Sequence, residues 1–95
     1  MITLIATLKI KEGKMKEAIN VLKEIVPIVK ASEPGCLEYI PHTVRGDDKT
    51  IIFYEKYIDK DALNLHSANL MKNIEKLLPI LEPGMDIKMC YEIIR

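Results

Sequence analysis

His66 is the side chain of this sequence best suited to acid–base chemistry on a small molecule. It lies four residues after Ala62 and four before Leu70, on the apolar side of a predicted helix. Histidine exchanges protons near neutral pH, so this position suits proton transfer to or from a phenolic or enediol substrate. We therefore predict that His66 is catalytic. The alternative is a core histidine that is hydrogen-bonded to the backbone.

Glu55 is a carboxylate within an otherwise apolar strand, on the same side as Phe53 and Tyr57. A buried carboxylate needs a partner or a raised pKa, and either would make Glu55 a second catalytic residue, as a base or as the group that orients His66. The alternative is an ion pair with a Lys or Arg of a second subunit. Tyr57 and Tyr39 carry phenolic donors that would bind a substrate carbonyl oxygen, or else they pack with their hydroxyls at the rim.

We expect neither a metal nor a cofactor. No second His, Cys or carboxylate lies at a metal-ligand spacing around His66, and His42, near a turn, is expected to be exposed. The sequence has no glycine-rich phosphate loop, Ser/His/Asp triad or dinucleotide fingerprint. Cys36 and Cys90 lack a Cys-x-x-Cys partner and are interpreted as reduced, buried thiols. With no signal-peptide pattern and no transmembrane run, we expect a cytoplasmic protein without a membrane partner.

The first half of the chain predicts a strand followed by a helix. Residues 2–10 are β-branched and apolar, and Lys11–Gly13 forms a turn. From Lys14 the apolar residues recur every three or four positions, which is typical of an amphipathic helix. Pro27 predicts a kink in this helix, and Glu33-Pro34-Gly35 predicts its end.

The second half predicts two strands, a helix and a last strand. The strands are expected at residues 36–44 and 50–57, joined by a turn at 45–49. Asp59 is a predicted N-cap, and Asn69 is expected to divide the following helix into two pieces. A second Glu-Pro-Gly, residues 82–84, is expected to end the later piece, and residues 85–94 then form the last strand with Met85, Ile87, Met89, Tyr91 and Ile93 on one face.

This order predicts an α+β, ferredoxin-like βαββαβ fold in one domain, residues 1–95, with a four-stranded antiparallel sheet and both helices on one face. The open face would carry Ile5 and Tyr54. A 95-residue chain buries only a marginal core by itself, so we expect a second copy to cover this face in a homodimer or a larger assembly.

The charge balance excludes several classes of partner. Fourteen Lys and Arg balance fourteen Asp and Glu, giving a formal net charge of zero. Such a chain has no general field to attract nucleic acid or an anionic membrane. The partners that remain are a second copy of the chain and a small aromatic or carbonyl ligand.

Four blocks of the sequence together resemble the antibiotic biosynthesis monooxygenase (ABM) family. They are residues 2–13, 33–39, 54–59 and 62–66, in order and at the family's spacing. The resemblance implies a dimeric α+β barrel with a pocket between sheet and helices in each subunit, and it matches His66 to a recurrent helix histidine. The residues that haem-degrading members use are replaced here by Ala6, Tyr57 and Glu75, so haem degradation is not expected.

The activity implied first is a cofactor-independent monooxygenase that uses O₂ on a quinol-like or polycyclic aromatic molecule. The family's frequent second helix histidine is replaced here by Leu70 or Met71. One alternative is a cofactor-free isomerase of a small phosphorylated carbonyl compound, which would need a cation such as Arg45, Lys56 or Lys88. The other is a non-catalytic dimeric ligand-binding module.

Overall fold

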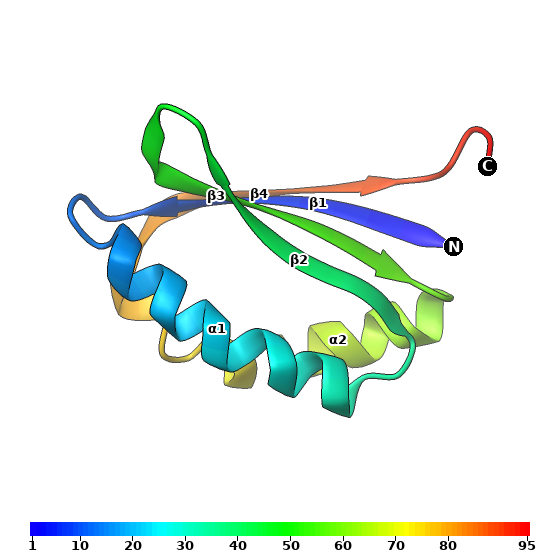
Figure 1. The fold of residues 1–95 in the computed structure, drawn as a ribbon. Helices are drawn as coiled ribbons and strands as arrows, with labels where there is room; N and C mark the ends of the chain where they lie inside the picture. Colours follow the sequence, from blue (N-terminus) through cyan, green and yellow to red (C-terminus); the bar gives the residue numbers. More distant parts are fainter.

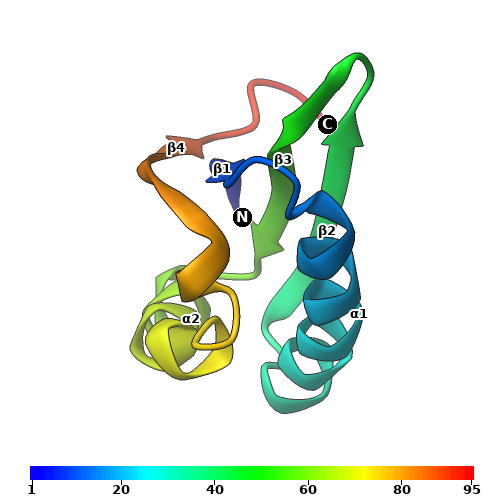
Figure 2. The same cartoon turned by 90° about the vertical axis from the view of Figure 1, so that its left-hand side faces the viewer.

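The computed structural model describes residues 1–95 and has the predicted order of main elements (Figure 1). The elements are β1 (Ile2–Ile10), α1 (Met15–Ser32), β2 (Cys36–Val44), β3 (Asp47–Tyr57), α2 (Lys60–Asn73), a short 3₁₀ helix (Leu78–Ile80) and β4 (Leu81–Cys90). The sheet is antiparallel with strand order β2-β3-β1-β4. Both helices lie under one face of it (Figures 1 and 2), so the predicted ferredoxin-like α+β fold is confirmed.

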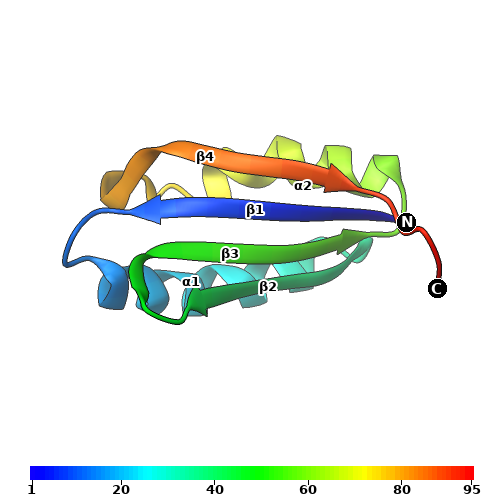
Figure 3. The same cartoon turned by 90° about the horizontal axis from the view of Figure 1, so that it is seen from above.

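The two faces of the sheet differ because neighbouring residues of a strand point to opposite sides. Leu4 pairs with Glu55 and Ala6 with Phe53, and all four are buried between sheet and helices. Ile5 pairs with Tyr54 on the other face, where both are half-buried. No helix covers this open face, which is turned toward the viewer in Figure 3. That a second copy covers it stays a prediction.

The helix α1 continues past Pro27 to Ser32. Its buried residues recur at helical spacing along the side that faces the sheet: Ala18, Leu22, Ile25 and Val29. Proline inside a helix removes one backbone hydrogen bond, but burial of this apolar stripe continues on both sides of it. The helix therefore ends where the sequence predicts, just before Glu33.

The predicted break of the second helix at Asn69 is wrong. Asp59 caps α2 as expected, since its carboxylate accepts a hydrogen bond from the Ala62 amide at 2.9 Å. The helix then runs without interruption to Asn73. Asparagine weakens a helix only slightly, and the inner side of α2 continues past Asn69, from the buried Leu63 and His66 to the half-buried Leu70.

The second Glu-Pro-Gly does not end a helix but lies inside β4, which runs from Leu81 to Cys90 rather than over residues 85–94. Backbone pairing of Ile10 with Leu81 starts the strand before Pro83. An edge strand tolerates proline, and Gly84, at φ 107°, accompanies a shift of register against β1. Residues 91–95, four of them predicted in the strand, leave the sheet at its end (Figure 3).

The turn between β2 and β3 is shorter than predicted, because β3 begins at Asp47. Gly46 there has φ 78°, which glycine adopts without strain. None of the helices is long and apolar enough to cross a membrane. Both cysteines are free.

Candidate functional site

His66 is buried on α2 and held by a carboxylate. Its Nδ1 atom lies 2.8 Å from Oε1 of Glu33, and only 3% of the residue is exposed. Its Nε2 atom lies 3.6 Å from Oε1 of Glu55. The partner of His66 is therefore an acidic side chain and not the backbone. Because a carboxylate accepts hydrogen bonds, the proton of a neutral imidazole would be on Nδ1 and its lone pair on Nε2.

Glu33 is the residue that the sequence analysis missed, because its tripeptide was interpreted only as a helix stop. It directly follows α1 and is 1% exposed. Its second oxygen accepts a long hydrogen bond, 3.5 Å, from Asn73. A signal was present in the sequence: Glu33 follows Val29 by four residues and so continues the buried stripe of α1. A carboxylate at such a position needs a buried partner.

A close approach of the chain at Gly35 brings Glu33 and His66 together. A Cβ atom at Gly35 would lie 2.5 Å from Cβ of Ala62, so only glycine leaves room for α2 here. The amide of Ile58, just before α2, donates to the Gly35 carbonyl at 2.9 Å. Ala62 lies one helical turn before His66, and Gly35 lies two residues after Glu33. The contact thus fixes both members of the pair.

Glu55 and Tyr57 form a second buried pair on β3. The Tyr57 hydroxyl donates to Oε1 of Glu55 at 2.6 Å. Burial raises the pKa of Glu55, while the Tyr57 hydrogen bond and the nearby His66 oppose that rise. Burial and the bond to Glu55 raise the pKa of Tyr57, so this tyrosine remains a phenol near neutral pH. Glu55 therefore has two partners within its own chain, Tyr57 and His66, and does not need a Lys or Arg of a second subunit.

The His66 ring lies beside two tyrosine rings. The centroids of Tyr39 and Tyr57 each lie 5.2 Å from that of His66, and Tyr39 also packs on Phe53 at 4.9 Å. Burial raises the pKa of Tyr39, which keeps its hydroxyl protonated. These ring contacts, together with the Glu33 hydrogen bond, hold the imidazole of His66 in one orientation.

A cavity of about 310 Å³ lies between the sheet and α2, beside this cluster. Tyr39, Glu55 and His66 line it, whereas Tyr57 is buried behind Glu55 and does not. The other lining residues are Leu4, Ala6, Leu8, Phe53, Leu63, Ser67, Leu70, Ile74, Leu77, Met85, Ile87 and Met89. The structure therefore brings together all four predicted site residues, three of them at the cavity wall.

Two polar atoms of this wall are free to meet a ligand. The Tyr39 hydroxyl and Oε2 of Glu55 make no hydrogen bond within the chain. No side-chain polar atom sealed from solvent lacks a partner, so both atoms must be reached from the cavity. With Nε2 of His66 they form one polar end in an otherwise apolar space.

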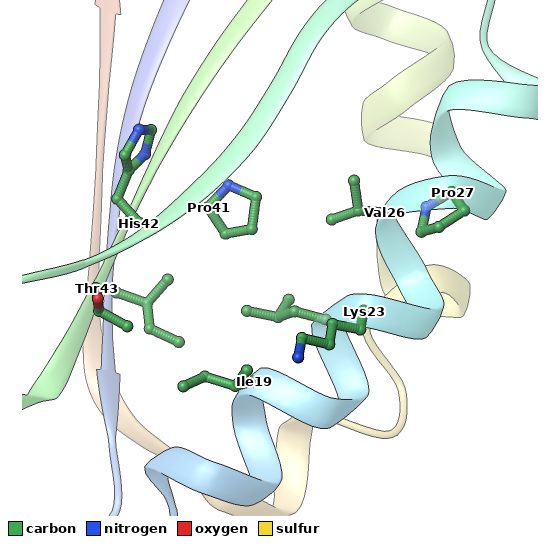
Figure 4. A pocket seen from close by; sticks show the side chains of 9 residues that line it. Ile19, Lys23, Val26, Pro27, Pro41, His42 and Thr43 are labelled. Carbon is green, nitrogen blue, oxygen red and sulfur yellow. The ribbon is translucent and has the colours of Figure 1, made fainter.

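A second hollow, about 440 Å³, lies between α1 and β2 (Figure 4). Lys23 is its charged lining residue, and Val26, Pro27 and Pro41 form much of the rest. His42 points away from α1 in this view, and its Nδ1 atom lies 3.3 Å from the Ile52 carbonyl oxygen. His42 is exposed as predicted, and this hollow holds no acid–base pair. The chain has no group of three or more His, Cys, Asp or Glu side chains arranged to hold a metal ion.

Comparison with known proteins identifies the family and the fold. The family model described as antibiotic biosynthesis monooxygenase matches residues 1–70, a span that includes Glu33, Glu55 and His66. A Caulobacter crescentus CB15 protein, described as a candidate antibiotic biosynthesis monooxygenase, is 26% identical with TM-score 0.87, over 97% of this chain and 89% of that one.

Two further solved structures share the fold. The protein PA3566 of Pseudomonas aeruginosa is 25% identical with TM-score 0.80, over 98% and 94% of the two chains. A Nitrosomonas europaea protein, at 13% identity and TM-score 0.85 over 99% and 100%, shows that the fold persists where little sequence is shared. No curated protein matches the chain.

Proposed function

Since the chain belongs to the antibiotic biosynthesis monooxygenase family, we propose that it is a cofactor-independent monooxygenase acting on a quinol-like or polycyclic aromatic molecule. The observation that supports this most is the buried Glu33–His66 pair, whose free imidazole edge lies on an apolar cavity. Such a cavity would hold a flat ring with one polar substituent against a base. Its apolar wall would also keep water from the part of the ring that it covers.

In this proposal His66 begins the reaction. Nε2 takes the proton of a substrate hydroxyl, and the resulting imidazolium is stabilised by Glu33 at Nδ1. Glu33 does not line the cavity, so it is a positioning residue. Tyr39 and Glu55 contact the substrate oxygen, and Tyr57 holds Glu55 in place.

The oxygen chemistry then needs only the substrate and O₂. The substrate anion passes one electron to O₂, the two radicals combine, and the hydroperoxide loses water to leave a carbonyl. A ring CH₂ group plus O₂ thus gives C=O plus H₂O. The substrate supplies all four electrons that reduce O₂, and both hydrogen atoms of the water. The polar end of the cavity would move the protons, and its apolar wall would hold the ring.

The isomerase alternative is less well supported by this site. A phosphorylated substrate would need a cation, and no Lys or Arg lines the cavity. The candidate cations Lys56 and Lys88 lie on β3 and β4 at positions that point to the open face. The oxygenase therefore remains the proposal.

We propose further that the chain acts as a homodimer joined through the open face of the sheet. Ile5 and Ile40 both pair with Tyr54, on either side of β3, and Ile52 lies beside them on the same face. All four side chains are half-buried rather than covered. Apolar side chains in such a cluster are expected to be covered by a like surface.

Oxygen uptake with menadiol tests the activity. We expect uptake above the autoxidation of the buffer, and a decrease of at least about 100-fold in His66→Asn, whose amide can still donate to Glu33. The matched control is His42→Asn, which removes the exposed histidine and should leave the rate unchanged. Oxygen uptake no faster than autoxidation, or equal uptake by wild type and His66→Asn, would contradict the proposal.

A further inference from the structure

We propose that the cavity selects its ligand by charge: it takes an uncharged ring compound that carries a hydroxyl group and rejects the anionic counterpart, with Glu55 as the specificity-determining residue. This inference rests on the proposed function in placing the substrate in the same cavity. It goes further by defining which substituents the ring must lack. Phosphate, sulfonate and carboxylate groups are all excluded by it.

The charges around the cavity carry the argument. Of the fifteen lining residues, Glu55 and His66 are the ionisable ones apart from the Tyr39 phenol. Glu33 lies directly behind His66, so two acidic groups stand at the polar end and no Lys or Arg accompanies them. An arriving anion would lose its water beside two carboxylates, with no Lys or Arg as its counter-charge, which is strongly unfavourable.

The nearby cations cannot turn inward to compensate. On β4, Met85, Ile87 and Met89 face the cavity, so Lys88 between them faces the other way. Lys88 pairs across the sheet with Ile5 of the open face, and its Nζ lies 3.0 Å from Asp86. The sheet itself therefore separates these charges from the ligand.

The unpartnered polar atoms define what the ligand must carry. Nε2 of His66 and Oε2 of Glu55 can each accept a proton or hydrogen bond, and the Tyr39 hydroxyl can donate one. A ligand hydroxyl group can donate its proton to one of the two acceptors and accept a hydrogen bond from Tyr39. The remaining wall is aliphatic and aromatic, and about 310 Å³ is at the small end of ligand pockets, which suits one or two rings.

The chain offers a matched pair of positions for a test. Ser67 and Ala68 are adjacent and exposed on α2, but only Ser67 lines the cavity. Ser67→Lys therefore adds a cation at the cavity, and Ala68→Lys adds the same charge outside it. Neither residue has a role in the proposed chemistry.

The experiment measures binding by equilibrium dialysis of two fluorescent probes, 2-naphthol and 6-hydroxynaphthalene-2-sulfonate, which differ by one anionic group. We expect the sulfonate to bind wild type at least about 100-fold more weakly than 2-naphthol. In Ser67→Lys the affinity for the sulfonate relative to 2-naphthol should rise about tenfold, and in Ala68→Lys it should stay at the wild-type value. Glu55→Gln should also make the affinities for the two probes more alike.

Equal binding of the two probes would overturn the inference, and so would no binding of 2-naphthol or equal recovery by both lysine variants. Binding needs no turnover, so these results are separate from the oxygen-uptake test. A protein that selects 2-naphthol but consumes no O₂ contradicts the proposed function alone. One that oxidises menadiol but binds both probes equally contradicts this inference alone.

Discussion

Glu33 and His66 lie 33 positions apart in the chain, yet Oε1 of Glu33 is 2.8 Å from Nδ1 of His66, and both side chains are buried. The pair joins the end of α1 to the middle of α2, the two helices that cover the same face of the sheet. Removing His66 would leave the buried Glu33 carboxylate without its short hydrogen bond, which costs about 1–3 kcal/mol or more. The pair therefore both ties the helices together and sets the imidazole for chemistry.

Glu33→Gln tests the positioning role of this carboxylate. We expect kcat for the menadiol reaction to decrease about 10–100-fold, the usual effect of removing the group that orients a histidine. KM should change little, because Glu33 does not line the cavity. Glu33→Asp should recover part of kcat by restoring the negative charge. The measurement is steady-state oxygen uptake over a range of menadiol concentrations.

The control for Glu33 is Glu24→Gln, on the same helix. Glu24 is exposed and lies 3.3 Å from Nζ of Lys76 in a surface ion pair. Such pairs contribute about 0–1 kcal/mol, so stability and kcat should both stay near wild type. If Glu24→Gln lowers kcat by as large a factor as Glu33→Gln does, or if Glu33→Gln changes KM alone, Glu33 does not position His66.

Glu55→Gln should change how stability depends on pH. Burial raises the pKa of Glu55 above its ordinary 4.5 in the folded protein. The folded state then binds this proton more tightly, so its contribution to stability is complete below about pH 4.5 and is lost as pH rises through the folded pKa. Glutamine does not titrate, so the stability of the variant should rise relative to wild type as pH increases from about 4.5 through the folded pKa of Glu55, by at most about 1.4 kcal/mol per pH unit.

Urea denaturation of both proteins across this pH range measures the effect. Asp47→Asn is the control with the opposite sign, since hydrogen bonds from Thr50 and the Lys49 amide lower the pKa of Asp47. That variant should lose stability relative to wild type as pH rises. A constant difference between Glu55→Gln and wild type would contradict the expected proton binding.

The Cys36 thiol should be unreactive in the folded protein. Burial, with a contribution from Glu33, raises the pKa of this thiol to about 11, so roughly one molecule in a thousand is thiolate at pH 8. In Cys90→Ser protein, where Cys36 is the remaining thiol, the reaction with Ellman's reagent should be at least about 100-fold slower before unfolding than in denaturant. Similar rates in the two states would show that Cys36 is accessible.

Periodicity alone was enough to predict most of the fold. Leu4, Ala6 and Leu8 share one side of β1, and the alternation places Ile5 on the open face; the structure buries the first three and leaves Ile5 half-buried. The same local logic places His66 on the inner side of α2. These features depend on neighbours within one element, which is why the sequence carries them.

The errors concern features decided by distant parts of the chain. The tripeptide Glu-Pro-Gly ends α1 at residues 33–35 but lies within β4 at 82–84, because there the backbone pairs with β1. Nothing in the tripeptide distinguishes the two cases. Likewise the role of Glu33 depends on α2, which is distant in sequence and comes close where Gly35 meets Ala62.

Ile5→Lys tests the proposed dimer. Ile5 lies on the central strand β1, in the open face. A lysine there stays solvated in a single chain but would be buried against a second copy, so the dimer dissociation constant should rise at least about 100-fold. The control is Ile28→Lys, which places the same charge on the exposed side of α1. Sedimentation velocity measures both; a monomeric wild type, or equal effects of the two variants, would contradict the proposal.

Gly35→Ala tests whether the close approach of the chain sets the site. The added Cβ would lie 2.5 Å from Cβ of Ala62, so we expect a loss of about 1–3 kcal/mol in the free energy of unfolding and a lower kcat, since Glu33 and His66 flank this contact. In the double variant Gly35→Ala with Ala62→Gly, the methyl group added at residue 35 replaces the one removed at residue 62. Its kcat should return to the wild-type value, and its free energy of unfolding should be about 1 kcal/mol below wild type, which is the cost of glycine within a helix. If it recovers neither, the loss at Gly35 is not a clash with α2; urea denaturation and oxygen uptake give both quantities.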